Sequence, residues 1–139
     1  MGLRRIRLEG PPGEPPKHYS DAVLAGGWLW VSGMMATGED GMLVGGDDAG
    51  AQAEQVITNL EAALDAGGAR LADVVKVTVY LTAMSDRPAV NAVRRRRFGE
   101  HRPASVLVQV AALAVPGARL EIDAVALLPG AGAPAVEAR

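Results

Sequence analysis

The chain has 139 residues, 49% hydrophobic and 22% charged, which is typical of one domain able to hold its core without metal or disulfides. Its net charge of −2 argues against a general nucleic-acid binder, which needs a basic surface. With no cysteine and two histidines we expect no metal site, and nothing indicates a signal peptide or membrane span, so we expect a cytoplasmic protein.

The first third of the chain predicts short strands. Residues 3–8 alternate polar and apolar side chains from Arg5 onward, as a half-buried strand does. Two apolar runs, 22–25 and 28–32, are joined by Gly26-Gly27. Glycine adopts the positive φ of tight turns, so this pattern predicts a hairpin.

A long helix is predicted from residue 48 to residue 66. Asp47 or Asp48 is a suitable N-cap, and Gly67-Gly68 stands where a left-handed C-terminal stop belongs. Apolar residues recur at helical spacing and form one face: Val56, Ile57, Leu60, Ala63 and Leu64.

The remaining elements alternate between strand and helix. Residues 74–81 are β-branched and alternating, which indicates a strand. A second helix is expected from Ser85 or Asp86 to Phe98, since proline is tolerated in a first turn. Two more strands are predicted at 106–112 and 119–127, and a tail at 130–139 is expected to fray.

This element order predicts an α+β domain, with a single mixed sheet and both helices on one face. The other face keeps apolar side chains such as Leu107 and Val125, with nothing in the chain to cover them. Such a face usually meets a partner, and a second copy of the chain is the simplest candidate.

Five segments occur in an order seen in a known family: Trp30–Gly33, Gln55–Leu60, Asp73–Thr82, Arg102–Leu113 and Leu120–Ala126. Together they resemble the Rid (reactive intermediate deaminase, YjgF-type) superfamily. The resemblance implies one Rid-like domain over 1–129, with a chorismate-mutase-like fold. It also implies a homotrimer that binds small molecules at its subunit interfaces and hydrolyses enamines and imines without a cofactor.

One position departs from that family. Its deaminating members read Pro-Ala-Arg, and the arginine binds the substrate carboxylate, whereas this chain has Pro103-Ala104-Ser105. A serine hydroxyl cannot replace a forked, permanently charged guanidinium. We therefore expect the chain not to hydrolyse the usual amino-acid-derived imines. Arg102 lies an odd number of residues from Ser105, which in an extended segment places it on the opposite face; whether Arg102 or His18 substitutes stays open.

Glu121 matches the family glutamate that positions the attacking water. A partly desolvated carboxylate has a raised pKa that suits proton transfer, so Glu121 is the candidate catalytic residue. Without the resemblance, a solvated or arginine-paired strand carboxylate is the simpler interpretation. Asp123, two residues on, is either a second pocket acid or, as we favour, an interface ion-pair partner.

Five more residues are candidates for substrate binding. Tyr19 matches a pocket tyrosine of the family, and ordinary packing explains it equally well. His18 stands where relatives have proline and is a candidate acid or base, although a surface loop histidine is the simpler interpretation. Ser32 and Asn91 match pocket positions but also suit turns and caps. Ser105 is a candidate hydrogen-bond donor, not a nucleophile, because no histidine is placed to activate it.

The run Arg94–Arg97 suggests phosphate or RNA binding. Consecutive helical residues point in different directions, however, so the four surround the axis, and acids such as Glu54 can neutralise them. We expect no nucleic-acid partner. Two functions are carried forward: an enzyme acting on an imine, an enamine or a related carbonyl compound, and a non-catalytic small-molecule-binding or regulatory trimer.

Overall fold

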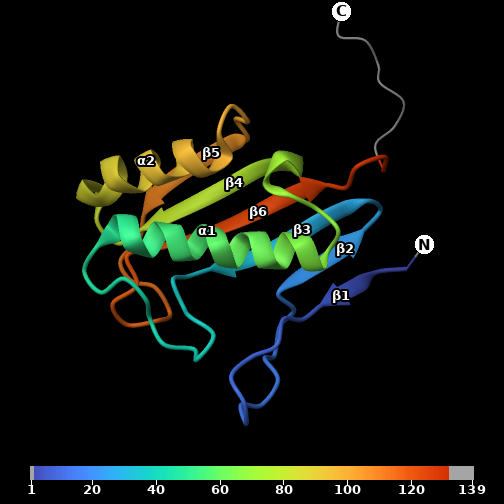
Figure 1. Ribbon diagram of the computed structural model, residues 1–139, viewed down its shortest axis with the longest axis horizontal. Helices are drawn as coiled ribbons and strands as arrows, with labels where there is room; N and C mark the ends of the chain where they lie inside the picture. The colour runs from blue at the N-terminus through green and yellow to red at the C-terminus, as the bar shows by residue number, and fades with distance from the viewer. Residues whose placement is uncertain (1, 132–139) are drawn as a thin grey trace, which may run out of the picture.

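The computed structural model describes residues 2–131 (Figure 1). The part of the predicted tail from residue 132 onward lies outside the described residues. The elements in chain order are β1 (Arg4–Ile6), β2 (Ala22–Ala25), β3 (Trp28–Met34), α1 (Ala49–Ala66), β4 (Val74–Leu81), α2 (Arg87–Phe98), β5 (Ala104–Gln109) and β6 (Leu120–Leu127), with short 3-10 turns at Leu71–Asp73 and Met84–Asp86.

The strands form one six-stranded sheet in the order β1-β2-β3-β6-β4-β5. All neighbours are antiparallel except β4 and β5, which run parallel because α2 connects them as a crossover. Both helices lie on the same side of the sheet, with α1 crossing its middle (Figure 1). The predicted single mixed sheet with two helices on one face is therefore confirmed.

Helix α1 follows the sequence prediction closely. The Asp48 side chain accepts a hydrogen bond from the Ala51 amide at 3.0 Å and caps the N-terminus. At the other end Gly67 is still right-handed, and only Gly68 adopts a positive φ, of 87°. The left-handed stop is thus one residue, Gly68, and not the glycine pair. Gly67 needs glycine for another reason, because a Cβ there would stand 2.5 Å from the buried side chain of Leu29.

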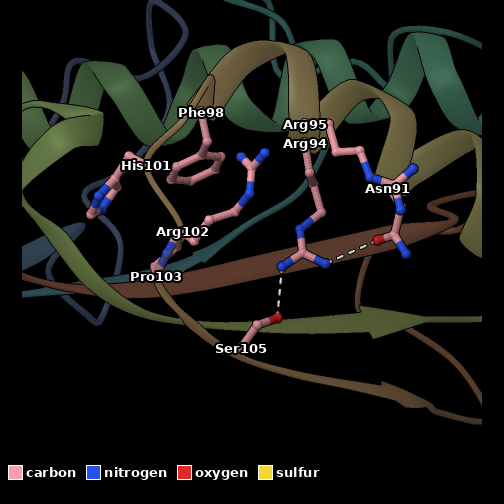
Figure 2. Close-up of a pocket in the computed structure, with 8 residues that line it drawn as sticks. All are labelled: Asn91, Arg94, Arg95, Phe98, His101, Arg102, Pro103 and Ser105. Atoms are coloured by element: carbon pink, nitrogen blue, oxygen red, sulfur yellow. Dashed lines mark hydrogen bonds between the residues drawn. The ribbon is translucent and has the colours of Figure 1, made fainter.

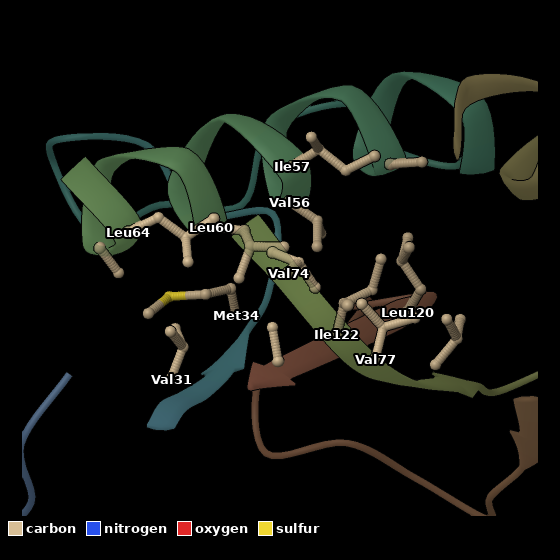
Figure 3. Close-up of a cluster of buried hydrophobic side chains, with 14 of the residues drawn as sticks. Val31, Met34, Val56, Ile57, Leu60, Leu64, Val74, Val77, Leu120 and Ile122 are labelled. Carbon is tan, nitrogen blue, oxygen red and sulfur yellow. The ribbon is translucent and has the colours of Figure 1, made fainter. Parts of the chain in front are cut away.

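The core fills the space between α1 and the sheet (Figure 3). The apolar face predicted for α1 is fully buried there, opposite side chains of β3, β4 and β6. Each large aliphatic side chain buried in this way contributes about 1.5–3 kcal/mol relative to exposure. The residues labelled in Figure 3 are Val31, Met34, Val56, Ile57, Leu60, Leu64, Val74, Val77, Leu120 and Ile122.

Strand β5 differs from its prediction of 106–112. It pairs in parallel with β4 from Lys76↔Ala104 to Leu81↔Gln109, so the end of β4 sets the end of β5. This register places Leu107 beside the buried Val79, on the helix face and packed against the core. The expectation that Leu107 lies on the uncovered face was wrong.

The uncovered face of the sheet still carries apolar side chains. Val125 is half-buried there and pairs in register with Trp30, which is 54% exposed. Val106 and Val108 extend the same surface across β5, at 43% and 38% exposure. No element among residues 2–131 covers this open face, defined by the outward side chains of the sheet.

Candidate functional site

Three polar side chains gather on the open face where β6 pairs with β4. Glu121 lies opposite Tyr80 in the register, and Asp123 follows two residues along β6. The Tyr80 hydroxyl donates a hydrogen bond to Asp123 Oδ2 at 3.2 Å. Asp123 thus has a partner within its own chain.

Glu121 is the acid of this group that is left without a hydrogen-bond donor among the described residues. Burial raises its pKa above the ordinary value, and the nearby negative charge of Asp123 raises it further. The pKa of Tyr80 is raised by burial first and then by the charge of Asp123 and the hydrogen bond to it. Glu121 therefore accepts a proton more readily than a solvated carboxylate does.

The raised pKa makes part of the stability depend on pH. Between the ordinary pKa of a glutamate and the raised value, the folded chain holds a proton that the unfolded chain has released, so stability falls as pH rises through this window. Glutamine does not titrate, so Glu121→Gln removes this loss of stability with rising pH. We expect the variant to gain stability relative to wild type as pH rises, with the difference levelling off above the raised pKa. Urea unfolding of both proteins from about pH 4 to pH 8 measures it; a difference that does not change with pH would contradict the assignment.

Gly33 provides the space in which Glu121 lies. The β3–β6 register is interrupted between Val31 and Met34, and a Cβ on Gly33 would stand 2.3 Å from Oε1 and 2.7 Å from the carboxyl carbon of Glu121. Gly33 itself has no positive φ, so its backbone accepts any residue. The short distance to the Glu121 side chain, and not the backbone conformation, is therefore the reason for glycine at position 33.

Gly33→Ala should therefore displace the Glu121 carboxylate without breaking the strand. We expect turnover to fall by about tenfold or more, since displacements on the order of 1 Å cost up to about 10²-fold, while the midpoint of urea unfolding changes little. Gly46→Ala is not a suitable control, because its φ of 52° adds backbone strain. Gly10→Ala, where a Cβ meets nothing within 4 Å, is suitable. Unchanged turnover in Gly33→Ala would show that the position of Glu121 does not matter.

The predicted binding residues of the N-terminal segment lie together near the start of β2. The rings of His18 and Tyr19 meet edge to face, 5.1 Å apart, and Lys17 Nζ lies 5.6 Å from the Tyr19 ring centroid. Lys17 pairs with the buried Asp21 at 2.7 Å, which holds this segment in place. Tyr19 is 46% exposed, so it is not an ordinary core residue.

Ser32 is held by the same segment. Its hydroxyl donates to the carbonyl oxygen of Ser20 at 2.7 Å, and its amide donates to the carbonyl of Asp21. These bonds join β3 to the end of the 17–21 segment. They agree with the simpler interpretation of Ser32 as a structural residue, although its oxygen keeps lone pairs for a further contact.

Asn91 and Ser105 lie at a second location, a cavity of about 270 Å³ between α2 and β5 (Figure 2). Arg94 joins them: its guanidinium donates to Asn91 Oδ1 at 3.0 Å and to Ser105 Oγ at 2.6 Å. Asn91 is thus not a capping residue. The residues lining the cavity are Asn91, Arg94, Arg95, Phe98, His101, Arg102, Pro103 and Ser105.

One chain does not bring the two groups together. Ser105 is in register with the buried Val77 and faces the helices, whereas Glu121 is in register with Tyr80 and lies on the open face. Side chains on opposite faces of a sheet point in opposite directions, so within one chain Ser105 and Glu121 cannot both contact the same small molecule. The chain therefore carries two separate parts of the predicted site.

Sequence reasoning missed Arg94 and Tyr80. Arg94 follows Asn91 by three residues on a helix, a spacing that places both on one face, so the signal was present. Arg102 was expected opposite Ser105, but it lines the same cavity because it precedes the start of β5, where strand alternation does not apply. Its guanidinium donates to the carbonyl of Gly99.

No helix within residues 2–131 is long and apolar enough to cross a membrane. No three histidine, aspartate or glutamate side chains in this part of the chain are grouped so that they could hold a metal ion.

The fold is a small α+β chain, a single mixed sheet with two helices on one face and with one polar group on each side of the sheet. The family described as Endoribonuclease L-PSP matches residues 12–128. A RutC family protein of Pyrococcus horikoshii is 40% identical over 122 residues, or 87% of this chain and 94% of that protein. The human 2-iminobutanoate/2-iminopropanoate deaminase is 38% identical over 110 residues, or 78% of this chain and 79% of that protein.

Solved structures of the same family superpose on this chain. A crystal structure of a YjgF/YER057c/UK114 family member from Mycobacterium tuberculosis superposes with a TM-score of 0.76 at 32% identity, covering 91% of this chain and all of the other. The chain belongs to the Endoribonuclease L-PSP family. Its resemblance to the Rid (YjgF) superfamily is confirmed.

Proposed function

We propose that this protein hydrolyses or isomerises an imine, an enamine or a related small carbonyl compound, without a cofactor, in a pocket built from two copies of the chain. The observation that carries the proposal is the raised-pKa Glu121 beside Gly33, a carboxylate with no donor partner among the described residues. The relative named 2-iminobutanoate/2-iminopropanoate deaminase supports the reaction class.

The chemistry needs only water and a group that moves protons. Water adds to the carbon of a C=N bond to give a carbinolamine, whose C–N bond then breaks to leave a carbonyl compound and ammonia. Glu121 takes a proton from the attacking water and gives it to the imine nitrogen, and it then takes the carbinolamine hydroxyl proton and gives it to the same nitrogen as ammonia leaves. A carboxylate with a raised pKa suits both steps, because the best general acid–base catalyst titrates near the working pH. An enamine first gains a proton on carbon and loses one from nitrogen.

A homotrimer is part of the proposal. The open face is apolar and uncovered within residues 2–131, and cyclic symmetry would bury it in the same way in every copy. The neighbouring copy would then bring Ser105 and Asn91 toward the Tyr19, Ser32 and Glu121 side of the next chain. The small-molecule ligand would lie at this interface, and the expected cytoplasmic location stays a prediction from the sequence.

The substrate class depends on position 105. Ser105 is neutral and cannot by itself hold a carboxylate, which is why the sequence argues against amino-acid-derived imines. A carboxylate is excluded at Ser105 only if no other cation lies beside it. Arg94 does reach it, at 2.6 Å.

The reaction class is tested by following ammonia release from freshly generated imines and enamines, both neutral and carboxylate-bearing, with and without the protein. We expect at least one compound to be hydrolysed faster than in buffer, with ammonia and the carbonyl product formed in equal amounts. No acceleration with any of them would favour the alternative, a non-catalytic small-molecule-binding or regulatory trimer, for which the neutral Ser105 is the favouring observation.

An RNA-directed activity has less support from the side chains, although the family description names an endoribonuclease. Arg97 pairs with Glu54 at 2.7 Å and also with Glu61, and Arg96 pairs with Glu54. These pairs join α2 to α1 and neutralise half of the arginine run, as a structural role requires.

A further inference from the structure

Arg94 stands at the centre of the cavity between α2 and β5. Its two terminal nitrogens donate in different directions, one to Asn91 on its own helix and one to Ser105 on the neighbouring strand (Figure 2). Two anchoring bonds hold the guanidinium plane at the cavity instead of letting it extend into solvent. A long side chain fixed in this way has already lost much of its rotamer freedom.

Arg94 also differs from Arg96 and Arg97 in charge balance. Arg96 and Arg97 pair with acids of α1, but Arg94 forms no ion pair with any acidic side chain among residues 2–131. No aspartate or glutamate lines the cavity. Burial lowers the pKa of Arg94 from its ordinary value, yet a guanidinium stays protonated in proteins. The cavity therefore holds a half-buried positive charge that has no counter-ion.

The groups around Arg94 have hydrogen-bond donors to spare. A guanidinium has five N–H groups, and two of them are used here. Ser105 accepts from Arg94 through its oxygen, which leaves its O–H free to donate. Asn91 likewise accepts through its carboxamide oxygen, which leaves its NH₂ group. A cation surrounded by free donors is complementary to an anion.

We infer that Arg94 is a carboxylate-binding residue of this protein and that, with Asn91 and Ser105, it selects small ligands that carry one carboxylate. The inference rests on the proposed function and names its substrate class. One half-buried guanidinium matches one carboxylate, since the other two arginines at the cavity, Arg95 and Arg102, are both exposed to solvent. The charge absent from position 105 is then supplied from α2, and amino-acid-derived imines become substrates.

Binding tests this inference without any catalysis. Titration calorimetry on the intact protein would use 2-oxobutanoate, the 2-oxo acid left by hydrolysis of 2-iminobutanoate, and its neutral amide. We expect the acid to bind more tightly than the amide. Arg94→Gln should weaken acid binding by about 10- to 100-fold, as loss of a charged hydrogen-bonding partner does, and leave amide binding unchanged. Arg94→Lys, which keeps the charge and loses the fork, should fall between the two.

Arg87→Gln is the matched control, because it removes the same charge from the same helix at an exposed position outside the cavity. It should bind the acid as wild type does. Equal loss in both variants would show a general charge effect, and no loss in Arg94→Gln would show that Arg94 does not bind the ligand; either result overturns the inference. Tighter binding of inorganic phosphate than of the acid at Arg94 would overturn the choice of carboxylate. Acid binding that depends on Arg94 in a protein with no hydrolytic activity would keep the inference and remove the proposed reaction.

Discussion

Glu121→Gln is expected to lower turnover by about 10²–10⁴ while the protein stays folded and assembled. Glutamine keeps the shape and hydrogen-bonding ability of the side chain but cannot take a proton from water. The raised pKa and the close fit against Gly33 are the observations from which Glu121 is proposed to move the proton. Initial rates of ammonia release, measured on whichever imine or enamine wild type hydrolyses best, provide the comparison.

Asp123→Asn is the matched control for Glu121→Gln. It makes the same chemical change two residues along the same strand face, at a carboxylate that accepts from Tyr80. We expect a much smaller loss of rate. Full activity in a folded, assembled Glu121→Gln protein would remove Glu121 from the mechanism, and His18 would become the next candidate.

Val125→Asp is expected to dissociate the proposed trimer into monomers of 14.4 kDa and to abolish turnover. Val125 lies on the open face of β6, so the substitution would bury an unpaired carboxylate at each contact, at several kcal/mol per ion. Cyclic symmetry repeats the penalty at every interface. The chain itself should still fold, because its core lies on the other side of the sheet. Light scattering coupled to gel filtration measures the mass.

Val44→Asp is the control for Val125→Asp, since Val44 is 40% exposed in the loop between β3 and α1, away from the sheet face. It should keep the mass of three chains. A wild-type protein with the mass of one chain at micromolar concentration would contradict the assembly and the shared pocket together. An active monomeric Val125→Asp protein would contradict the shared pocket alone.

The parts of the fold that sequence predicted well are those with strong local signals. Helix α1 combines an aspartate cap, a periodic apolar face and a glycine stop, and all three act within the helix itself. Strand β5 was misplaced because its limits depend on β4, a partner about 30 residues away. Leu107 was also assigned to the wrong face, because a strand's pairing register decides which of its side chains point inward, and this register depends on β4.

The candidate site was harder to predict from the sequence, because it too depends on contacts between residues that are distant in the chain. Motif matching found Asn91 and Ser105 separately, but the residue that joins them belongs to an arginine run that also pairs with α1. Only the packing of α2 over β5 shows that Arg94 turns away from its neighbours toward Ser105. Likewise, nothing in the local sequence of Gly33 indicates that its missing side chain makes room for a carboxylate nearly 90 residues away.

The place of β6 in the sheet has a consequence for how this protein is made. β6 lies between β3 and β4, yet every other strand precedes it in the chain. During synthesis β1–β3 and β4–β5 are two half-sheets with no shared edge, and each exposes unpaired backbone to the cell until residues 120–127 emerge. Closure must then bridge large sequence separations, which slows folding. The strand that completes the sheet also brings Glu121, so the nascent chain gains its structure and its candidate catalytic acid in the same step.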